Sequence, residues 1–318
     1  MIILRLFVFW PLLLASYGVF AAEKLLVSID LIRHGERTPI IEIPNSPYLW
    51  KEGLGQLTER GQQQAELLGQ ELAQEYWSSM DMQIMNKDRG EAIKSMRFSS
   101  SNRERTIATA KAFIKGIFPA GDTDKIVIKI EDDELLITRP SRNPISIFKL
   151  YWWKRKVWKA LLREQEAELL HWRTISGLAL ENFEDLGLFA DNLFVRRLHQ
   201  IPFPQGLSEE TANTIIALSD WEMVELFKRA EVSEPMGKRF LEQVDTIFKE
   251  RKLKHIFYFA HDSSIMAVMT TLGVPLNKAP DYLSRLNFSL FALEDGRQVV
   301  RIKFNQKFIK GYPYQKSF

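Results

Sequence analysis

The hydrophobic and polar positions of this 318-residue chain repeat with two different periods. From Leu25 to Ile32 the chain is mostly apolar, both at the odd-numbered and at the even-numbered positions. This pattern is typical of a strand that is buried on both faces. After Thr58, a residue type that caps helices, apolar positions recur every third or fourth residue as far as Tyr76. The pattern therefore predicts a buried strand followed by an amphipathic helix.

Alternating strand and helix patterns continue along the chain. Near its end, Asp295-Gly296 can supply the positive-φ residues of a tight turn between two alternating runs, which indicates a terminal β-hairpin. Strands that alternate with helices favour an α/β sandwich. The predicted strands are residues 96–99, 126–130, 256–260, 286–290 and 300–304, and the predicted helices are residues 103–117 and 263–272.

The middle of the chain has a different pattern. Between residues 139 and 245 strand signals are scarce and long amphipathic or charged stretches dominate, for example residues 208–230. We therefore expect an all-helical cap lobe, residues 139–245, inserted into an α/β catalytic core made of residues 22–138 and 246–318. No internal repeat interrupts this organisation.

The N-terminal residues resemble a secretory signal peptide. A single charge at Arg5 precedes the apolar stretch Leu6 to Leu14, and small residues suit cleavage between Ala21 and Ala22. We expect residues 1–21 to be removed and the protein to be exported, as a periplasmic or secreted protein. An uncleaved membrane anchor is the alternative, because residues 6–22 approach the length of about 17–25 apolar residues that spans a bilayer.

Composition narrows the chemistry. The chain has no cysteine, which excludes disulfides, thiol catalysis and cysteine-ligated zinc or iron–sulfur centres. The formal net charge of +3 is too small to indicate a nucleic-acid partner. The chain has neither a glycine-rich phosphate loop nor a His-Glu-x-x-His zinc motif, so we expect no metal and no cofactor.

Two short polar clusters come directly after predicted strands. Arg33-His34-Gly35-Glu36-Arg37-Thr38-Pro39 follows the first strand, and His261-Asp262 follows the strand at residues 256–260. Open α/β sheets bind ligands at the carboxyl ends of their strands. A histidine between two arginines brings together groups that repel one another unless an anion lies among them, and guanidinium groups bind phosphate oxygens in pairs. The clusters therefore indicate a phosphate site.

With these residues the chain resembles the histidine acid phosphatase branch of the histidine phosphatase superfamily, which includes prostatic-type acid phosphatases and phytases. The signature of that branch, Arg-His-Gly-x-Arg-x-Pro, stands at Arg33 to Pro39, and its later His-Asp pair at His261-Asp262. A third arginine of the family is best matched by Arg105, with Arg103 as the alternative. Further similarity lies in Leu57-Thr58-x-x-Gly61-x-x-Gln64, in residues 208–211 and in residues 280–284.

The resemblance implies a fold and a role for each residue. The core would be a three-layer α/β sandwich of the phosphoglycerate mutase type. His34 would attack phosphorus to form a phosphohistidine, and Asp262 would donate a proton to the leaving alcohol. The phosphoryl oxygens would be bound by Arg33, Arg37, Arg105 and His261.

Several alternatives stay open. The phosphoglycerate mutase branch shares part of the signature but is disfavoured by the export signal, the large lobe and the aspartate after the second histidine. A phytase is disfavoured because Ile40, Ile41 and Glu42 stand where phytases usually carry threonine and basic residues. A phosphatase specific for a lipid or sugar phosphate, and a non-catalytic polyanion-binding protein on the same fold, are further candidates.

The expected partner is a small-molecule phosphate monoester. The sequence leaves the oligomeric state open, a dimer included. The stretch from Tyr151 to Lys159 alternates aromatic and basic residues, a composition that can lie on membranes. A helix with its aromatic side chains packed inward and its lysines in solvent is the favoured interpretation, so membrane contact is not the expectation.

Overall fold

The structure, a computed structural model, describes residues 23–77, 89–119, 123, 125–139 and 141–309. The predicted signal peptide, residues 1–21, lies outside the described residues. Within the described part of the chain, no helix is both long enough and apolar enough to span a membrane.

A seven-stranded sheet forms the centre of the molecule, with the order β3-β2-β4-β1-β5-β6-β7. Strands β3, β2, β4 and β1 run parallel to one another, and β5, β6 and β7 add an antiparallel side. The sheet confirms the predicted strands and hairpin, and it adds the short strand β7. The bounds are β1 Lys24–Arg33, β2 Met96–Ser100, β3 Ile128–Ile130, β4 His255–Ala260, β5 Arg285–Ala292, β6 Gln298–Phe304 and β7 Lys307–Phe308.

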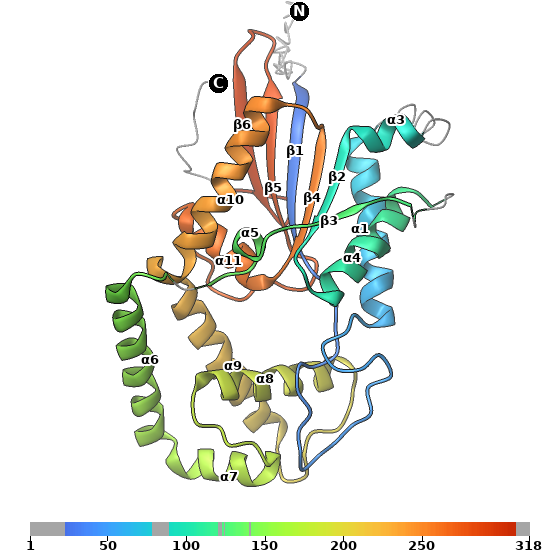
Figure 1. Ribbon diagram of the computed structural model, residues 1–318. Helices are drawn as coiled ribbons and strands as arrows, with labels where there is room; N and C mark the ends of the chain where they lie inside the picture. The colour runs from blue at the N-terminus through green and yellow to red at the C-terminus, as the bar shows by residue number, and fades with distance from the viewer. Residues whose placement is uncertain (1–22, 78–88, 120–122, 124, 140, 310–318) are drawn as a thin grey trace, which may run out of the picture.

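Helices cover both faces of this sheet (Figure 1). Strand β4 shows why, because Phe257 and Phe259 point to one face while Ile256 and Tyr258 point to the other, and all four are fully buried. The phenylalanine face packs against α1 (Glu59–Tyr76) and α4 (Glu104–Ile117). The opposite face packs against α10 (Ala230–Glu250) and α11 (Asp262–Thr271). The expected three-layer α/β sandwich is thus confirmed.

Beyond α11 and away from the sheet lies a helical lobe (Figure 1). Its own hydrophobic cluster includes Trp172, Leu186, Phe189 and Leu193. Asn143, Asn182 and Ser208 cap three of its helices with their side-chain oxygens. The lobe helices are α6 Pro144–Glu164, α7 Glu166–Ser176, α8 Phe183–Leu198 and α9 Glu209–Phe227, and two short helices of the core are α3 Arg89–Lys94 and α5 Asp133–Leu136.

Helix α10 bears on where the lobe ends. The expected boundary at residue 245 falls inside this helix. Met236, Phe240 and Val244 on α10 belong to the hydrophobic cluster of the sheet and not to that of the lobe. The division into domains stays a prediction, and the packing of α10 favours a boundary near residue 229 over one at residue 245.

Candidate active site

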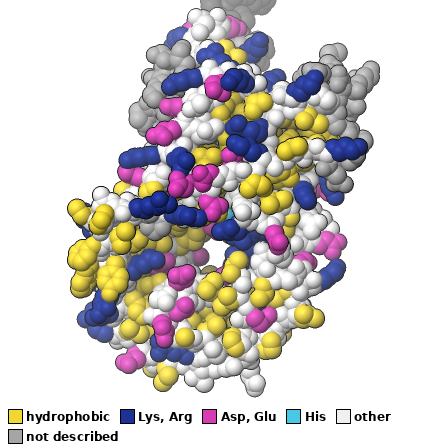
Figure 2. Space-filling model, viewed as in Figure 1, with side chains coloured by type: hydrophobic (Ala, Val, Ile, Leu, Met, Phe, Trp, Pro, Cys, Tyr) yellow, Lys and Arg dark blue, Asp and Glu magenta, His cyan; other side chains and the backbone are white. Residues whose placement is uncertain are grey.

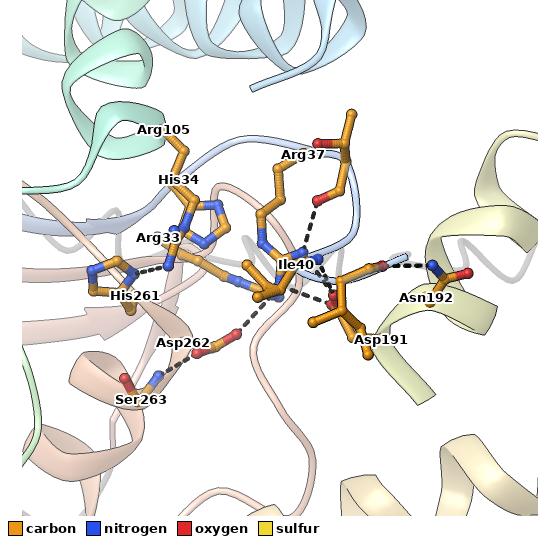
Figure 3. Close-up of polar contacts among 12 residues, drawn as sticks. Arg33, His34, Arg37, Ile40, Arg105, Asp191, Asn192, His261, Asp262 and Ser263 are labelled. Atoms are coloured by element: carbon orange, nitrogen blue, oxygen red, sulfur yellow. Dashed lines mark hydrogen bonds and ion pairs between the residues drawn. The ribbon is translucent and has the colours of Figure 1, made fainter. Parts of the chain in front are cut away.

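The site is assembled where two neighbouring strands end. Strands β1 and β4 are parallel, and Arg33 at the end of β1 pairs with Ala260 at the end of β4. The next residues, His34 and His261, therefore come to the same edge of the sheet, and the His34 N–H donates to the Ala260 carbonyl at 3.0 Å. Their imidazole rings meet edge to face with centroids 5.6 Å apart (Figure 3).

The loop after His34 is held against the first turn of α1. A Cβ atom at Gly61 would stand 2.2 Å from the Glu36 carbonyl oxygen, and one at Gly35 would stand 2.8 Å from the Gly61 carbonyl oxygen. Only two residues without side chains allow the backbones to approach this closely. The Thr58 hydroxyl accepts from the Gly61 N–H at 2.9 Å and donates to the Glu36 carboxylate at 3.1 Å, which fixes the loop to the helix.

The hydrogen bonding of His34 sets its tautomer. Its Nδ1 atom lies 2.9 Å from the Gly35 carbonyl oxygen, which can only accept, so Nδ1 carries the proton and Nε2 keeps a lone pair. The side chain is 2% exposed. Burial, followed by the charges of Arg33, Arg37 and Arg105, holds the pKa of His34 well below its usual value. The geometry therefore presents a neutral, nucleophilic imidazole.

Arg33 and Asp262 form the first charged contact of the site. Arg33 Nη2 lies 2.7 Å from Asp262 Oδ2, and the guanidinium also donates to the Pro280 carbonyl and lies 4.3 Å from the centre of the Tyr282 ring. Asp262 is the first residue of α11, and its Oδ1 accepts from the Ser263 N–H at 2.7 Å. Burial acts to raise the pKa of Asp262, but Arg33 and that N–H outweigh burial and leave the pKa below its usual value.

Arg37 reaches the lobe. Its Nη2 and Nη1 atoms donate to the two carboxylate oxygens of Asp191 on α8 at 2.8 and 3.0 Å. Asp191 also accepts from the Ile40 N–H at 3.1 Å, and the neighbouring Asn192 donates to the Ile41 carbonyl at 2.8 Å (Figure 3). Helix α8 thus fixes both the guanidinium and the chain that follows the signature.

Arg105 and His261 form the third group. Arg105 Nη2 lies 3.5 Å from His261 Nδ1, and since a guanidinium only donates, Nδ1 is the acceptor. His261 Nε2 then donates to the Ser101 hydroxyl at 3.0 Å. Burial and the charge of Arg105 lower the pKa of His261 to about 4. The alternative Arg103 is exposed, and its guanidinium donates to the Asn102 carbonyl instead.

Each of the three arginines has one N–H donor, at Nε, without a hydrogen-bond partner among the described residues. These Nε atoms of Arg33, Arg37 and Arg105 are buried. A buried donor without a partner costs free energy, which an anion that accepts from it would recover. Three such donors around one neutral histidine indicate a site for a group with several anionic oxygens.

A cavity of about 1140 Å³ opens between the core and the lobe, where the surface is hollowed in Figure 2. Arg33, Arg37 and Asp262 line its core side. Asp191 and Phe194 of α8 line the lobe side, and Tyr282 lies between. The end of the cavity at Arg33, Arg37 and Asp262 is therefore charged, and the space beyond it is bounded by the lobe.

The structure brings together all six residues singled out in the sequence, Arg33, His34, Arg37, Arg105, His261 and Asp262. Sequence reasoning missed Asp191, Ser101 and Tyr282 as members of the site. Tyr282 lies within residues 280–284, which the sequence marks only by their similarity to the family. Asp191 lies within an amphipathic helix, where nothing in the sequence pattern marks one carboxylate as different from the others.

A metal site does not emerge from the described residues, among which no group of three or more His, Cys, Asp or Glu side chains is placed to hold an ion. The expectation of metal-independent chemistry stays a prediction. The arrangement that the chain does offer is a nucleophile, a set of cations and a carboxyl group.

Comparison with known proteins gives a consistent result. Residues 27–143 and 178–305 match the family model described as histidine phosphatase superfamily (branch 2). Lysosomal acid phosphatase of Bos taurus is 25% identical over 303 residues, covering 87% of this chain and 70% of the relative. Testicular acid phosphatase of Homo sapiens is 26% identical over 322 residues, covering 87% and 71%.

Solved structures share the fold. The phytase from Citrobacter braakii has a TM-score of 0.64 at 13% identity and covers 89% of this chain and 85% of its own. The Hafnia alvei phytase apo form has a TM-score of 0.62 at 14% identity and covers 89% and 84%. At these identities the likeness concerns the fold alone.

Proposed function

Because this chain belongs to branch 2 of the histidine phosphatase superfamily, as its sequence predicted, we propose that it is an acid phosphatase that hydrolyses phosphate monoesters. The observation that carries the proposal is the state of His34. A neutral imidazole with a free Nε2 lone pair lies among three guanidinium groups whose Nε donors have no partner within the described part of the chain.

The first step transfers the phosphoryl group to His34. Arg33, Arg37 and Arg105 donate to the phosphoryl oxygens, and His261 joins them once a proton on its Nδ1 takes the place of the contact with Arg105. The charge that develops on these oxygens is stabilised by these donors. His34 Nε2 forms a bond to phosphorus as the bond to the ester oxygen breaks. Protonated Asp262 gives its proton to that oxygen, which leaves as an alcohol.

The second step restores the enzyme. Asp262, now a carboxylate, accepts a proton from a water molecule as that water attacks phosphorus. The bond between phosphorus and Nε2 breaks, inorganic phosphate leaves, and Asp262 is again protonated. The same carboxyl group therefore serves as acid in one step and as base in the next.

Two pKa shifts favour activity in acid. The pKa of His34 lies well below its usual value, so the nucleophile stays neutral as the pH falls. The pKa of Asp262 is also low without substrate, and the donor therefore requires an acidic medium, helped by a bound phosphoryl anion that raises this pKa. Activity should rise toward acidic pH and decline toward neutrality.

The charge of the cavity disfavours a substrate with many phosphates, such as phytate. Beyond the residues assigned to the phosphoryl group and Asp191, acidic side chains outnumber basic ones in the cavity lining. A polyanion would meet repulsion there, whereas a monoester with a neutral or apolar body would not. The acidic residues are Glu36, Glu184, Asp220, Glu222 and Asp281, and the basic ones are Arg60, Lys154 and Arg197.

We propose that the protein acts outside the cytosol, as an exported periplasmic or secreted enzyme. The pattern of residues 1–21 supports this proposal. Sequencing the N-terminus of the protein recovered from an exporting host tests it, since cleavage should leave Ala22 as the first residue.

A quench experiment tests the proposed reaction. The enzyme is mixed with a radiolabelled aryl phosphate and denatured within one turnover, and the label should remain on the wild-type protein through a bond that is labile to acid. His34→Ala should retain no label. His171→Ala, a change at an exposed lobe histidine, should retain it as the wild type does.

The non-catalytic alternative makes a different prediction. A polyanion-binding protein would bind phosphate reversibly and retain no covalent label in wild type or in either variant. That outcome, together with absent turnover, would contradict the phosphatase.

A further inference from the structure

The outer face of α6 exposes apolar side chains, and two of them, Tyr151 and Trp152, are ones that the expected inward packing would have buried. Ile145, Phe148 and Trp152 are 66%, 63% and 52% exposed. Ile147 and Tyr151 beside them are also exposed. Exposed single apolar residues are common, but five within two turns of one helix make a contiguous patch.

The expectation of inward aromatic side chains is correct for part of the stretch and wrong for the rest. Trp153 and Trp158 are partly buried, with Arg229 4.8 Å from the Trp153 ring centre and the Trp158 and Phe183 rings 5.2 Å apart. Trp152 points away, because the helical period places it opposite the buried Leu150 and Leu161, and Tyr151 lies at the edge between the two sides with 55% exposure. The Trp152 ring packs instead on Phe148, 5.9 Å away along the same face.

Every charged residue of this helix before its last residue, Glu164, is basic. From Arg142 to Arg163 the sequence contains seven basic residues and no acidic one, although the whole chain carries only +3. Among the described residues, no acidic side chain forms an ion pair with any of the five that point outward. These five are Lys149, Arg155, Lys156, Lys159 and Arg163.

Ile145, Phe148 and Trp152 lie on the same side of the helix as the outward basic residues, and the exposed Ile147 and Tyr151 flank them. The apolar side chains occupy its first two turns, and most of the basic ones follow in the next turns (Figure 2, left edge). An apolar group that inserts next to cations that remain at the headgroups is the pattern of a helix that lies in a membrane interface. Tryptophan and tyrosine suit that interface because their rings are amphipathic.

The positive charge also indicates what kind of partner binds this side of the helix. A second copy of this chain, docked through the same face, would bring two sets of like charges together, which disfavours such a dimer. An anionic surface would instead attract each of these basic side chains. We propose that this face of α6 docks the protein on membranes that contain anionic phospholipids. We call it the α6 face, and its residues are Ile145, Ile147, Phe148, Tyr151, Trp152, Lys149, Arg155, Lys156 and Lys159.

The docking does not depend on the proposed activity. Lys154 on the same helix lines the cavity, whereas the α6 face points to solvent. A docked helix would therefore keep the cavity within about one helix diameter, roughly 10 Å, of the lipid surface.

Vesicle sedimentation tests the proposal. The protein released in soluble form by an exporting host is mixed with vesicles of phosphatidylcholine alone, or with vesicles that also contain phosphatidylglycerol. Wild type should sediment with the anionic vesicles at low salt and much less at high salt, because salt screens the attraction. Each removed cation should weaken binding about five-fold, so Arg155→Gln, Lys156→Gln and Lys159→Gln together should weaken it by roughly a hundredfold.

Matched variants separate the α6 face from net charge. Lys111→Gln, Lys115→Gln and Lys252→Gln remove the same charge from exposed positions elsewhere and should leave binding near the wild-type level. Phe148→Ser with Trp152→Ser should weaken binding at least ten-fold, whereas Leu67→Ser, at an exposed position of α1, should not. Turnover of a soluble ester should be unchanged in every variant, which shows that each is folded.

Two results would overturn the proposal. One is wild-type protein that stays in the supernatant with anionic vesicles at low salt. The other is an equal loss of binding in the α6 triple variant and in the control triple variant, which would make the attraction a matter of net charge. Because all variants share one N-terminus, an N-terminal contribution to binding would be the same in each.

Discussion

The Arg37 guanidinium and the Asp191 carboxylate meet through two hydrogen bonds, 2.8 and 3.0 Å long, that join the signature loop to helix α8 of the lobe. Both side chains are largely buried. The lobe therefore does more than bound the cavity, because one of its side chains determines where a proposed phosphate-binding arginine points.

Asp191→Ala should lower kcat/KM for an aryl phosphate about ten- to a hundredfold, since a charge-assisted hydrogen-bonded contact is worth roughly 1.5–3 kcal/mol. The loss should fall mainly on KM, and Asp191→Asn, which keeps one acceptor, should lose less. Steady-state kinetics measure both. Glu234→Ala, which removes an exposed ion pair with Lys238, is the control and should change little. Equal kinetics in Asp191→Ala and wild type would mean that Arg37 needs no partner.

Arg105→Gln should move the acid limb of the pH profile to higher pH. Arg105 is one of the cations that lower the pKa of His34, and removing it raises that pKa. His34 then becomes protonated, and inactive as a nucleophile, at a higher pH than in wild type. The dependence of kcat/KM on pH measures the shift. Arg103→Gln removes an exposed charge two residues away and should leave the limb in place; a limb unmoved in both variants would argue against His34 as the titrating group.

Asp262→Asn should discriminate between leaving groups. An alkoxide needs a proton from the enzyme more than a phenolate does, and general acid catalysis contributes about 10²–10⁴-fold. Turnover of an alkyl phosphate should fall by about that factor, and turnover of an aryl phosphate much less. Asp220→Asn, at another carboxylate of the cavity lining, should show no such difference. An equal loss on both substrates would remove Asp262 from the role of donor.

Gly61→Ala should disrupt the signature loop. The added methyl group would stand 2.2 Å from the Glu36 carbonyl oxygen, so the loop or the helix must shift. We expect a loss of about 2 kcal/mol or more in the free energy of unfolding, together with most of the activity. Gly187→Ala makes the same change in α8, where the nearest atom is 3.5 Å away, and should be neutral or stabilising. Urea unfolding of the two variants compares them directly, and equal stability would show that the close approach is dispensable.

His255→Phe should make the fold more resistant to acid. His255 is fully buried between Tyr76 and Trp77, and burial lowers its pKa to about 3. Its usual pKa is about 6.5, so below that pH the unfolded chain binds a proton that the folded chain does not. The free energy of unfolding is therefore unaffected by the titration of His255 above about pH 6.5. Below that pH it falls by about 1.4 kcal/mol per pH unit as the pH approaches 3. Unfolding curves near neutral pH and near pH 4 should show the variant losing less; parallel losses would contradict the assignment.

The sequence was a good guide wherever local pattern decides structure. The apolar runs at β1 and β4 are buried on both faces, and burial of that kind leaves a direct trace in residue type. Parallel strands bring their carboxyl ends to one edge of the sheet. The positions of the two apolar runs therefore predict that His34 and His261, which follow them, lie close together. Thr58 likewise caps α1 as its position predicted.

The sequence was a poor guide where distant segments meet. The amphipathic pattern of α10 resembles that of the lobe helices, and it does not reveal that the apolar side packs on the sheet. The partner of Asp191 lies 154 residues away, which no helical period encodes. Strand β3 begins at Ile128 and not at 126, and Val127 is 81% exposed although its residue type favours strands.

The position of β4 has a consequence for the order of assembly. This strand lies between β1 and β2, although more than 150 residues separate it from β2 along the chain. A chain growing from a ribosome therefore completes both flanking strands long before the strand that joins them exists. Until residues 255–262 have emerged, no half-made chain can bring the two histidines together, so the reactive centre is among the last features that synthesis supplies.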